Sequence, residues 1–400
     1  MRRTLLGCLL FTVFSQTTLA ATPRIVGGDP VTTAPSWMVA LESRLENGTF
    51  FQFCGGTLIA PQWVLTAAHC VESAELGRLN LIIGQALLDG HTTGAKVDQL
   101  IVHPDWLVTG TNEKQNIAEF AHDIALLHLT EAQTATPVQL ATQAQQDMLA
   151  VNQDSVAIGW GATDAGGTQY PYQLQGITLP YAGVQEPLLL PDHIYAGGNM
   201  GEGICFGDSG GPLLVNGIQF GLSSFIEGDS SGYICGNVNY PAAFTSTASH
   251  ETWIAAQLHG LNYTNRQAIT TYPGSQATAH FVIRNDDTVD WQLGQITSSS
   301  PINAPCQQTT LTPGQSCTVD VTYPAGAVGD KRTISIDFTA ESNKGQLSDT
   351  LILEGSTLAP IPDDTVSSSG GGSLGYLALG GLAVLALGRR RHASRHASNR

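Results

Sequence analysis

Three short segments place a histidine, an aspartate and a serine where each could take part in proton transfer. His69 stands in Thr-Ala-Ala-His-Cys, Asp123 precedes the apolar run Ile-Ala-Leu-Leu, and Ser209 lies in the turn Gly-Asp-Ser-Gly-Gly-Pro. A serine hydroxyl is a weak nucleophile unless a base removes its proton, and histidine titrates close to neutral pH. An aspartate can hold the imidazole in the required tautomer and stabilise the imidazolium. These residue types predict acyl-transfer chemistry.

The glycines around Ser209 indicate how a negatively charged oxygen would be stabilised. Glycine reaches backbone conformations that other residues disfavour, so this turn can direct the N–H groups of Gly207 and Ser209 to one point. Such donors stabilise the oxyanion of a tetrahedral intermediate, and one donor is typically worth roughly 3–4 kcal/mol. Each segment alone is usually structural, but the three together, in the order His, Asp, Ser, predict a catalytic triad.

With these segments in place, residues 25–258 resemble the chymotrypsin–trypsin family of serine proteases. The resemblance also rests on Ile-Val-Gly-Gly at 25–28, Phe-Cys-Gly-Gly-Thr-Leu-Ile at 53–59 and Gly-Trp-Gly at 159–161. It implies an all-β fold of two six-stranded β-barrels with the triad between them, and hydrolysis of protein or peptide substrates. No cofactor is implied. No metal site is expected, because the loop after Gly84 lacks the acidic ligands that some relatives use for calcium.

The cysteines are consistent with this resemblance. Six of the 7 remain once a leader containing Cys8 is removed, an even number that suits an oxidising compartment. The resemblance implies two bridges, one beside the histidine and one bracing the specificity pocket, and the last two cysteines lie within one small block. The expected pairs are Cys54 with Cys70, Cys205 with Cys235, and Cys306 with Cys317.

The junction Arg24-Ile25-Val26-Gly27-Gly28 resembles the activation site of the family's zymogens. Cleavage after Arg24 by a trypsin-like protease would free the ammonium group of Ile25. This cation could then pair with a buried Asp208, which needs such a partner, and so order the oxyanion turn. The alternative is that Asp208 is an ordinary turn aspartate.

The expected specificity pocket lacks the charged floor of trypsin. By resemblance, the floor of the pocket is Gly203. Two wall positions that are glycine in wide-pocketed relatives carry the larger side chains of Ile226 and Ala242. The resemblance therefore favours small aliphatic residues before the cleaved bond. A preference for Lys or Arg before the cleaved bond stays open, because Glu202 neighbours the floor of the pocket. A third alternative is a preference for larger apolar residues, or a broad specificity. The expected pocket residues are Gly203, Ile204, Ser224, Phe225, Ile226 and Ala242.

Composition and patterning agree with a β-rich exported protein. The 400 residues include only 12% charged residues, with 44 glycines and 19 prolines, which favours strands and turns over long helices. The formal charge of −16 opposes binding to nucleic acid. A helix is expected over 249–258, and strands at 279–283, 317–323, 333–338 and 347–353 predict a small immunoglobulin-like sandwich.

The chain is expected to contain a protease domain and a sandwich domain between processed ends. A basic start, an apolar run and Thr-Leu-Ala at 18–20 predict a secretory signal. A lipoprotein signal ending at Cys8 is the alternative, but few apolar residues precede that cysteine. The expected segments are a signal peptide (1–20), a propeptide (21–24), the protease domain (25–258), the sandwich (263–357), a Ser/Gly linker (358–373) and an apolar, basic tail (374–400).

The tail resembles the GlyGly-CTERM sorting signal of Gram-negative bacteria. Ser-Ser-Ser-Gly-Gly-Gly-Ser at 367–373 precedes fourteen apolar-rich residues at 374–387 and an arginine cluster. The run is short for a bilayer span, which needs about 20 residues. The resemblance implies export through the periplasm to the cell surface or medium, with a sorting protease and secretion machinery as partners. An ordinary C-terminal anchor is the alternative.

Two other functions remain open from the sequence. The protease-like domain could serve only for surface adhesion or interaction, although its triad positions are intact. The block 263–357 could itself be the main functional unit and bind a partner or glycan, since sandwich folds host many functions.

Overall fold

The computed structural model describes residues 25–106, 120–183, 190, 192–198, 201–226, 228–229 and 232–359. The expected signal peptide, the propeptide with Arg24, and the sorting tail lie outside these residues. Within the described part of the chain, no helix is long and apolar enough to cross a membrane.

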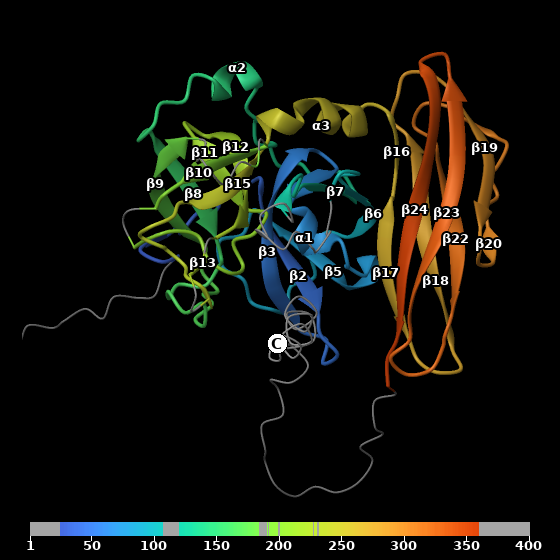
Figure 1. The fold of residues 1–400 in the computed structure, drawn as a ribbon, viewed down its shortest axis with the longest axis horizontal. Coiled ribbons are helices and arrows are strands. Elements are labelled where there is room, and N and C mark those ends of the chain that lie inside the picture. Colours follow the sequence, from blue (N-terminus) through green and yellow to red (C-terminus); the bar gives the residue numbers. More distant parts are fainter. Residues whose placement is uncertain are drawn as a thin grey trace, which may run out of the picture. The chain divides into compact units, whose positions relative to one another are not determined.

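The first half of the protease region is a six-stranded antiparallel sheet (Figure 1). Its strands bury apolar side chains in long runs, and β2 is fully buried over its first five residues. A Cβ at Gly55 in β3 would lie 3.0 Å from Gly211 Cα, so this glycine allows the serine turn to approach closely. The strand order is β5 (Leu79–Ile83), β2 (Met38–Arg44), β3 (Phe50–Ala60), β4 (Trp63–Thr66), β7 (Ala125–Leu129) and β6 (Val97–Val102).

The second half forms a closed barrel. Each of six strands pairs with the next one around the sheet, and an additional ladder between β8 and β9 joins the last strand to the first. The short β1 (Asp29–Pro30) also pairs with β9. The barrel strands are β9 (Gln175–Gly183), β10 (His193–Ala196), β15 (Ala242–Ser246), β12 (Ile218–Phe225), β11 (Pro212–Val215) and β8 (Asp154–Gly159).

Short helices and one small hairpin complete the protease region. The sequence predicted a helix over 249–258, and the structure has a 3₁₀ turn leading into α3, whose Ile254 is buried. The remaining elements are α1 (Ala68–Val71), η1 (Leu76–Arg78), α2 (Gln143–Gln146), β13 (Gly228–Asp229), β14 (Gly232–Tyr233), η3 (Ala248–His250) and α3 (Glu251–Leu258).

The C-terminal block consists of two sheets around one core. In β23, residues are buried alternately from Ile334 to Ala340, which is the period of a strand with one face on a core. That core takes side chains from both sheets, including Phe281 and Phe338. One sheet contains β16 (Leu261–Tyr263), β18 (Gln276–Asn285), β22 (Ser316–Pro324) and β20 (Ile302–Asn303); the other contains β17 (Arg266–Thr271), β24 (Gly345–Thr357), β23 (Lys331–Ser342), β19 (Trp291–Ser298) and β21 (Thr310–Leu311).

The fold class expected from the sequence is confirmed, with one difference in the first half. Among the described residues, no ladder joins β5 to β6, so this half is an open half-barrel rather than a closed one. The four sandwich strands expected from alternation correspond to β18, β22, β23 and β24. The described residues form three disulfides, which join the same pairs as expected: Cys54–Cys70, Cys205–Cys235 and Cys306–Cys317.

Candidate active site

His69 is fixed at two points by one aspartate. Asp123 Oδ1 accepts the backbone N–H of His69 at 2.9 Å, and Asp123 Oδ2 lies 2.7 Å from His69 Nδ1. The histidine lies in the single-turn helix α1, which follows β4, and the neighbouring Cys54–Cys70 disulfide ties α1 to β3. Because Nδ1 faces a carboxylate, it carries the proton, and Nε2 keeps a free lone pair. The His69 side chain is 26% exposed, so the imidazole is partly open to solvent.

Asp123 is fully buried between the two halves of the protease region. Ser224 Oγ donates to its Oδ2 at 2.6 Å, and Thr245 Oγ1 donates to its backbone oxygen at 3.1 Å. Burial alone would raise the pKa of Asp123, but the charge and hydrogen bonds of His69, with help from Ser224, hold it below its usual value. Burial alone would lower the pKa of His69, and the charge of Asp123 overcomes this and raises it. The pair therefore favours an ionised aspartate beside a basic imidazole.

Ser209 lies in a turn whose backbone conformation requires glycine at two positions. Gly207 and Gly210 have φ values of 97° and 76°, in the left-handed region. A Cβ at Gly210 would collide with Gly55 and Thr66. The Ser209 carbonyl accepts the Gly55 N–H at 2.7 Å, which joins the turn to β3.

The donors around Ser209 are available for a ligand. Among the hydrogen bonds of the described residues, none uses the N–H of Gly207 or Ser209 as donor. Both carbonyl oxygens of this part of the turn accept hydrogen bonds from other segments. Gln52 Nε2 donates to the Gly207 carbonyl at 2.8 Å, and Ala162 N donates to the Phe206 carbonyl at 2.8 Å. Among the described residues, the contacts of His69 Nε2 include one with Cys70 Sγ at 3.8 Å and none with Ser209 Oγ. A Ser–His contact often tightens only when substrate binds.

The sequence of this region also matches a known protein family. A family model described as Trypsin matches residues 25–254. The chain belongs to the trypsin family. It is therefore a trypsin-family serine endopeptidase.

Two relatives of this trypsin-family chain share most of their own length with it. A trypsin of Phaedon cochleariae is 29% identical over an alignment of 270 positions, which covers 62% of this chain and 96% of that protein. Chymotrypsin-like elastase family member 1 of Canis lupus familiaris is 34% identical over 249 residues, covering 58% of this chain and 91% of the relative.

Two solved structures extend the likeness in fold beyond the trypsin match. The VesB protease of Vibrio cholerae has a TM-score of 0.56 at 22% identity and covers 84% of this chain and 100% of its own. The secreted serine protease VesC of Vibrio cholerae has a TM-score of 0.57 at 22% identity, covering 85% of this chain and 73% of its own. These shares exceed the 25–254 match, so the common fold includes part of the C-terminal sheets.

The aspartate next to the serine is buried. Asp208 is 1% exposed and accepts the N–H groups of Gly161 at 2.8 Å and Cys205 at 2.9 Å. Among the described residues, no ion pair to Asp208 occurs, and burial raises its pKa to about 7. The Ile25 side chain is fully buried, and Val26 forms a β-bridge with Gly203, so the start of the protease region lies within the fold.

The expected specificity pocket is a very small cavity. Its volume is about 10 Å³, roughly enough for one water molecule. Four of the expected residues line it: Gly203, Ile204, Ile226 and Ala242. The other lining residues, not predicted as pocket residues, are Ala196, Gly198, Glu202, Ile234, Gly236, Asn237 and Tyr240.

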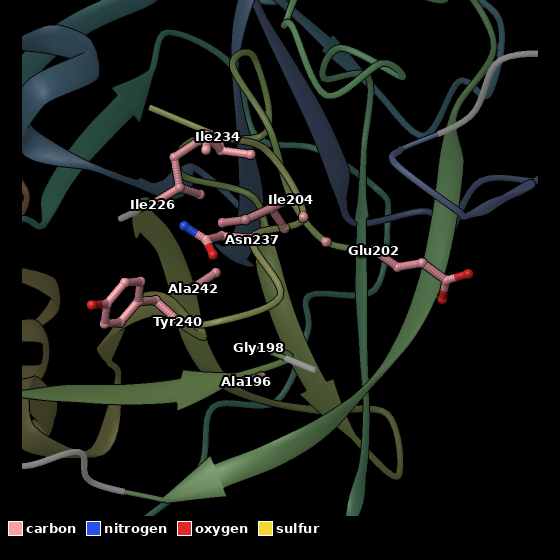
Figure 2. A pocket seen from close by; sticks show the side chains of 11 residues that line it. Ala196, Gly198, Glu202, Ile204, Ile226, Ile234, Asn237, Tyr240 and Ala242 are labelled. Atoms are coloured by element: carbon pink, nitrogen blue, oxygen red, sulfur yellow. The ribbon is translucent and has the colours of Figure 1, made fainter. Parts of the chain in front are cut away.

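Two expected wall residues have other contacts. The Ser224 hydroxyl donates to Asp123, and the Phe225 ring packs against Phe120 with centroids 4.8 Å apart, so neither residue lines this cavity. The Glu202 side chain points away from the apolar group formed by the isoleucines (Figure 2). The side-chain carbons of Glu202 occupy the space that a Cβ on Gly27 would need, so Glu202 packs against the start of the protease region.

Proposed function

We propose that this chain is an exported serine endopeptidase in which Ser209 is the nucleophile, His69 the general base and Asp123 the residue that orients the base. The observation that carries the proposal is the two-point contact between His69 and the buried Asp123, with distances of 2.9 and 2.7 Å. It fixes the imidazole so that Nε2 faces away from the carboxylate and can accept a proton.

The proposed reaction follows from this geometry. His69 Nε2 takes the Ser209 Oγ proton as the oxygen attacks the scissile carbonyl carbon. The oxyanion accepts hydrogen bonds from the N–H groups of Gly207 and Ser209, which have no other acceptor among the described residues. The imidazolium then protonates the leaving amine, and a water molecule, deprotonated by the same nitrogen, hydrolyses the acyl-enzyme.

A fluorophosphonate probe tests whether the serine is activated. Such probes react only with a serine whose proton is removed, so matured enzyme is expected to incorporate one equivalent, at the peptide that contains Ser209. Ser209→Ala is expected to remain unlabelled, whereas Ser298→Ala in β19 should label like wild type. Absence of labelling in matured wild-type chain would support the alternative of a non-catalytic adhesion protein.

We further propose a preference for small aliphatic residues before the cleaved bond. Ile204, Ile226 and Ile234 leave a space of about 10 Å³ without a charged floor. The direction of the Glu202 side chain counts against the basic alternative. A Lys or Arg side chain entering this space would lose its hydration without a counter-ion, which costs several kcal/mol.

The specificity proposal predicts an order of kcat/KM on matched peptides. Substrates with Ala or Val before the cut should exceed those with Arg by about 100-fold or more, because a buried unpaired charge outweighs the 1–3 kcal/mol from filling a slot. Ile226→Gly should widen the slot and raise kcat/KM for Phe relative to Ala. A preference for Arg that disappears in Glu202→Gln would show that the carboxylate reaches the pocket and overturn this assignment.

The three disulfides support the proposal of export, because such bonds persist in oxidising compartments. The proposed route uses the signal at 1–20 and the sorting tail at 374–400. Its proposed partners are a sorting protease, the secretion machinery and an activating trypsin-like protease.

A further inference from the structure

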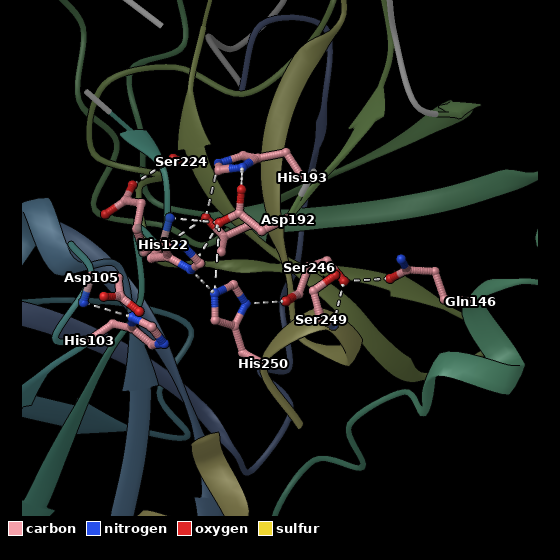
Figure 3. Close-up of polar contacts among 12 residues, drawn as sticks. His103, Asp105, His122, Gln146, Asp192, His193, Ser224, Ser246, Ser249 and His250 are labelled. Carbon is pink, nitrogen blue, oxygen red and sulfur yellow. Dashed lines mark hydrogen bonds and ion pairs between the residues drawn. The ribbon is translucent and has the colours of Figure 1, made fainter. Parts of the chain in front are cut away.

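A cluster of ionisable side chains lies directly behind the Asp123 segment and takes no part in the proposed chemistry. It contains His122, His250 and Asp192, with His103 and His193 at its edges (Figure 3). The first three residues come from distant parts of the sequence and converge on one point. Asp192 and His250 are buried, while the His122 side chain is 37% exposed.

Three atoms of this cluster have the spacing of metal ligands. His122 Nδ1 lies 3.1 Å from His250 Nε2, and Asp192 Oδ2 lies 3.8 Å from the first nitrogen and 3.7 Å from the second. Ligand atoms on a tetrahedral Zn²⁺ with bonds of about 2.0–2.1 Å are roughly 3.3 Å apart. Shifts of about half an ångström would therefore bring all three atoms onto one ion.

The surrounding hydrogen bonds aim these atoms inward. His250 Nδ1 lies 2.8 Å from the Ser246 carbonyl, which can only accept, so Nδ1 carries the proton and Nε2 presents its lone pair to the cluster. Asp192 Oδ2 accepts the His122 backbone N–H at 2.6 Å, and Oδ1 lies 3.0 Å from His193 Nδ1. Metal-binding histidines and carboxylates typically have outer partners of this kind.

The tautomers of the two histidines also suit a metal ion. Without an ion, His122 Nδ1–H can donate to His250 Nε2. Since the His122 ring is partly exposed, its proton can move through solvent to Nε2 and free Nδ1 without any net change in charge.

His103 borders the cluster without completing it. Its ring stacks on His122, with planes 7° apart and centroids separated by 4.6 Å. A ligand nitrogen must point at the metal within its own ring plane, so one ion cannot satisfy both stacked rings. In this orientation His103 packs against the site and leaves a fourth position for water.

We propose that His122 Nδ1, His250 Nε2 and Asp192 Oδ2 bind one divalent transition-metal ion of the Zn²⁺ class, with water as the fourth ligand. Two imidazoles and one carboxylate are a ligand set that zinc accepts, whereas Ca²⁺ and Mg²⁺ prefer all-oxygen sites. The ion would lie next to the backbone of His122, one residue before Asp123.

Calorimetric titration of the full matured chain with Zn²⁺ tests the site. The Ser209→Ala background is used throughout, so that self-digestion does not interfere. One ion per chain is expected to bind with a micromolar or lower Kd, and Co²⁺ should give the visible absorption of a four-coordinate site. Mg²⁺ at the same concentration should not bind.

The decisive variant is His122→Asn, which suits the φ of 57° at this position because asparagine tolerates that conformation. It should weaken Zn²⁺ binding at least 10-fold and abolish the Co²⁺ absorption, while its Tm without metal stays close to that of the parent. His280→Gln is the matched control, because His280 also faces a carboxylate, at 2.7 Å from Asp320, but belongs to no group of three possible ligands among the described residues. Unchanged binding in His122→Asn, or no binding in the parent, would show that the cluster is only a hydrogen-bonded network.

Discussion

Ser209→Ala is expected to lower kcat by about 10⁶-fold, because the proposed mechanism has no other group that can form the acyl-enzyme. The residual rate would come from substrate binding and the oxyanion donors, which are backbone groups and remain in place. The measurement is single-turnover hydrolysis of a peptide with Ala before the cut, using enzyme matured by an added activator.

The control for this experiment is stability. The Ser209 carbonyl, not its side chain, holds the turn to β3 through Gly55, so Tm should change little. His69→Ala should lose activity to a similar extent, and the double variant should lose little more, since the two residues act in one step. Near wild-type turnover in Ser209→Ala would falsify the assignment of the nucleophile.

The geometry around His69 follows from local sequence, which explains why the sequence led to it. Thr-Ala-Ala-His-Cys ends a buried strand, and its cysteine bridges to the neighbouring strand, so the histidine has little freedom. The glycines around Ser209 encode the left-handed conformations that the turn needs. Such features depend on a few adjacent residues and can be read without the rest of the chain.

The residues that line the pocket could not all be predicted from local sequence, because they are set by contacts between distant segments. Ile234 lines the cavity, yet it lies in the connection between β14 and β15, where no motif marks its position. Ser224 was expected as a wall, but its hydroxyl contacts Asp123, 101 residues away in the sequence. Which way a side chain on β12 points depends on the neighbouring strands and loops, so residue type alone could not decide it.

The same limit applies to the histidine cluster and to the shorter sandwich strands. His122 and His250 are 128 residues apart, and each alone is an ordinary histidine. Strands such as β20 and β21 contain two residues each, too few to show a period of two. Only the packing of whole sheets brings these segments into register.

The second large effect is expected from activation. Arg24→Gln should prevent release of the Ile25 ammonium and leave the chain at least about 10²–10³-fold less active, the cost of one misplaced oxyanion donor. Asp208→Asn in the cleaved enzyme should show a similar loss, since the ammonium would have no partner. N-terminal sequencing of active wild-type enzyme should begin at Ile25, and a different start would contradict the proposal.

The buried Asp208 adds a pH dependence of stability that separates the two forms. In the absence of a cation its pKa in the fold is raised from 3.8 to about 7, so the folded state binds the proton more tightly than the unfolded chain. Stability is therefore fully present below about pH 4 and decreases as the pH rises towards 7, by about 4 kcal/mol in total. In cleaved enzyme the ammonium would favour the ionised carboxylate and remove this decrease.

Denaturant unfolding between pH 4 and 8 measures this difference. Uncleaved Arg24→Gln, carrying Ser209→Ala to prevent self-digestion, should lose stability over this range relative to cleaved Ser209→Ala enzyme. Adding Asp208→Asn to the uncleaved chain should abolish the difference in slope, because asparagine does not titrate. Equal slopes in the uncleaved and cleaved forms would mean that Ile25 does not supply the charge for Asp208, even if cleavage after Arg24 is needed for activity.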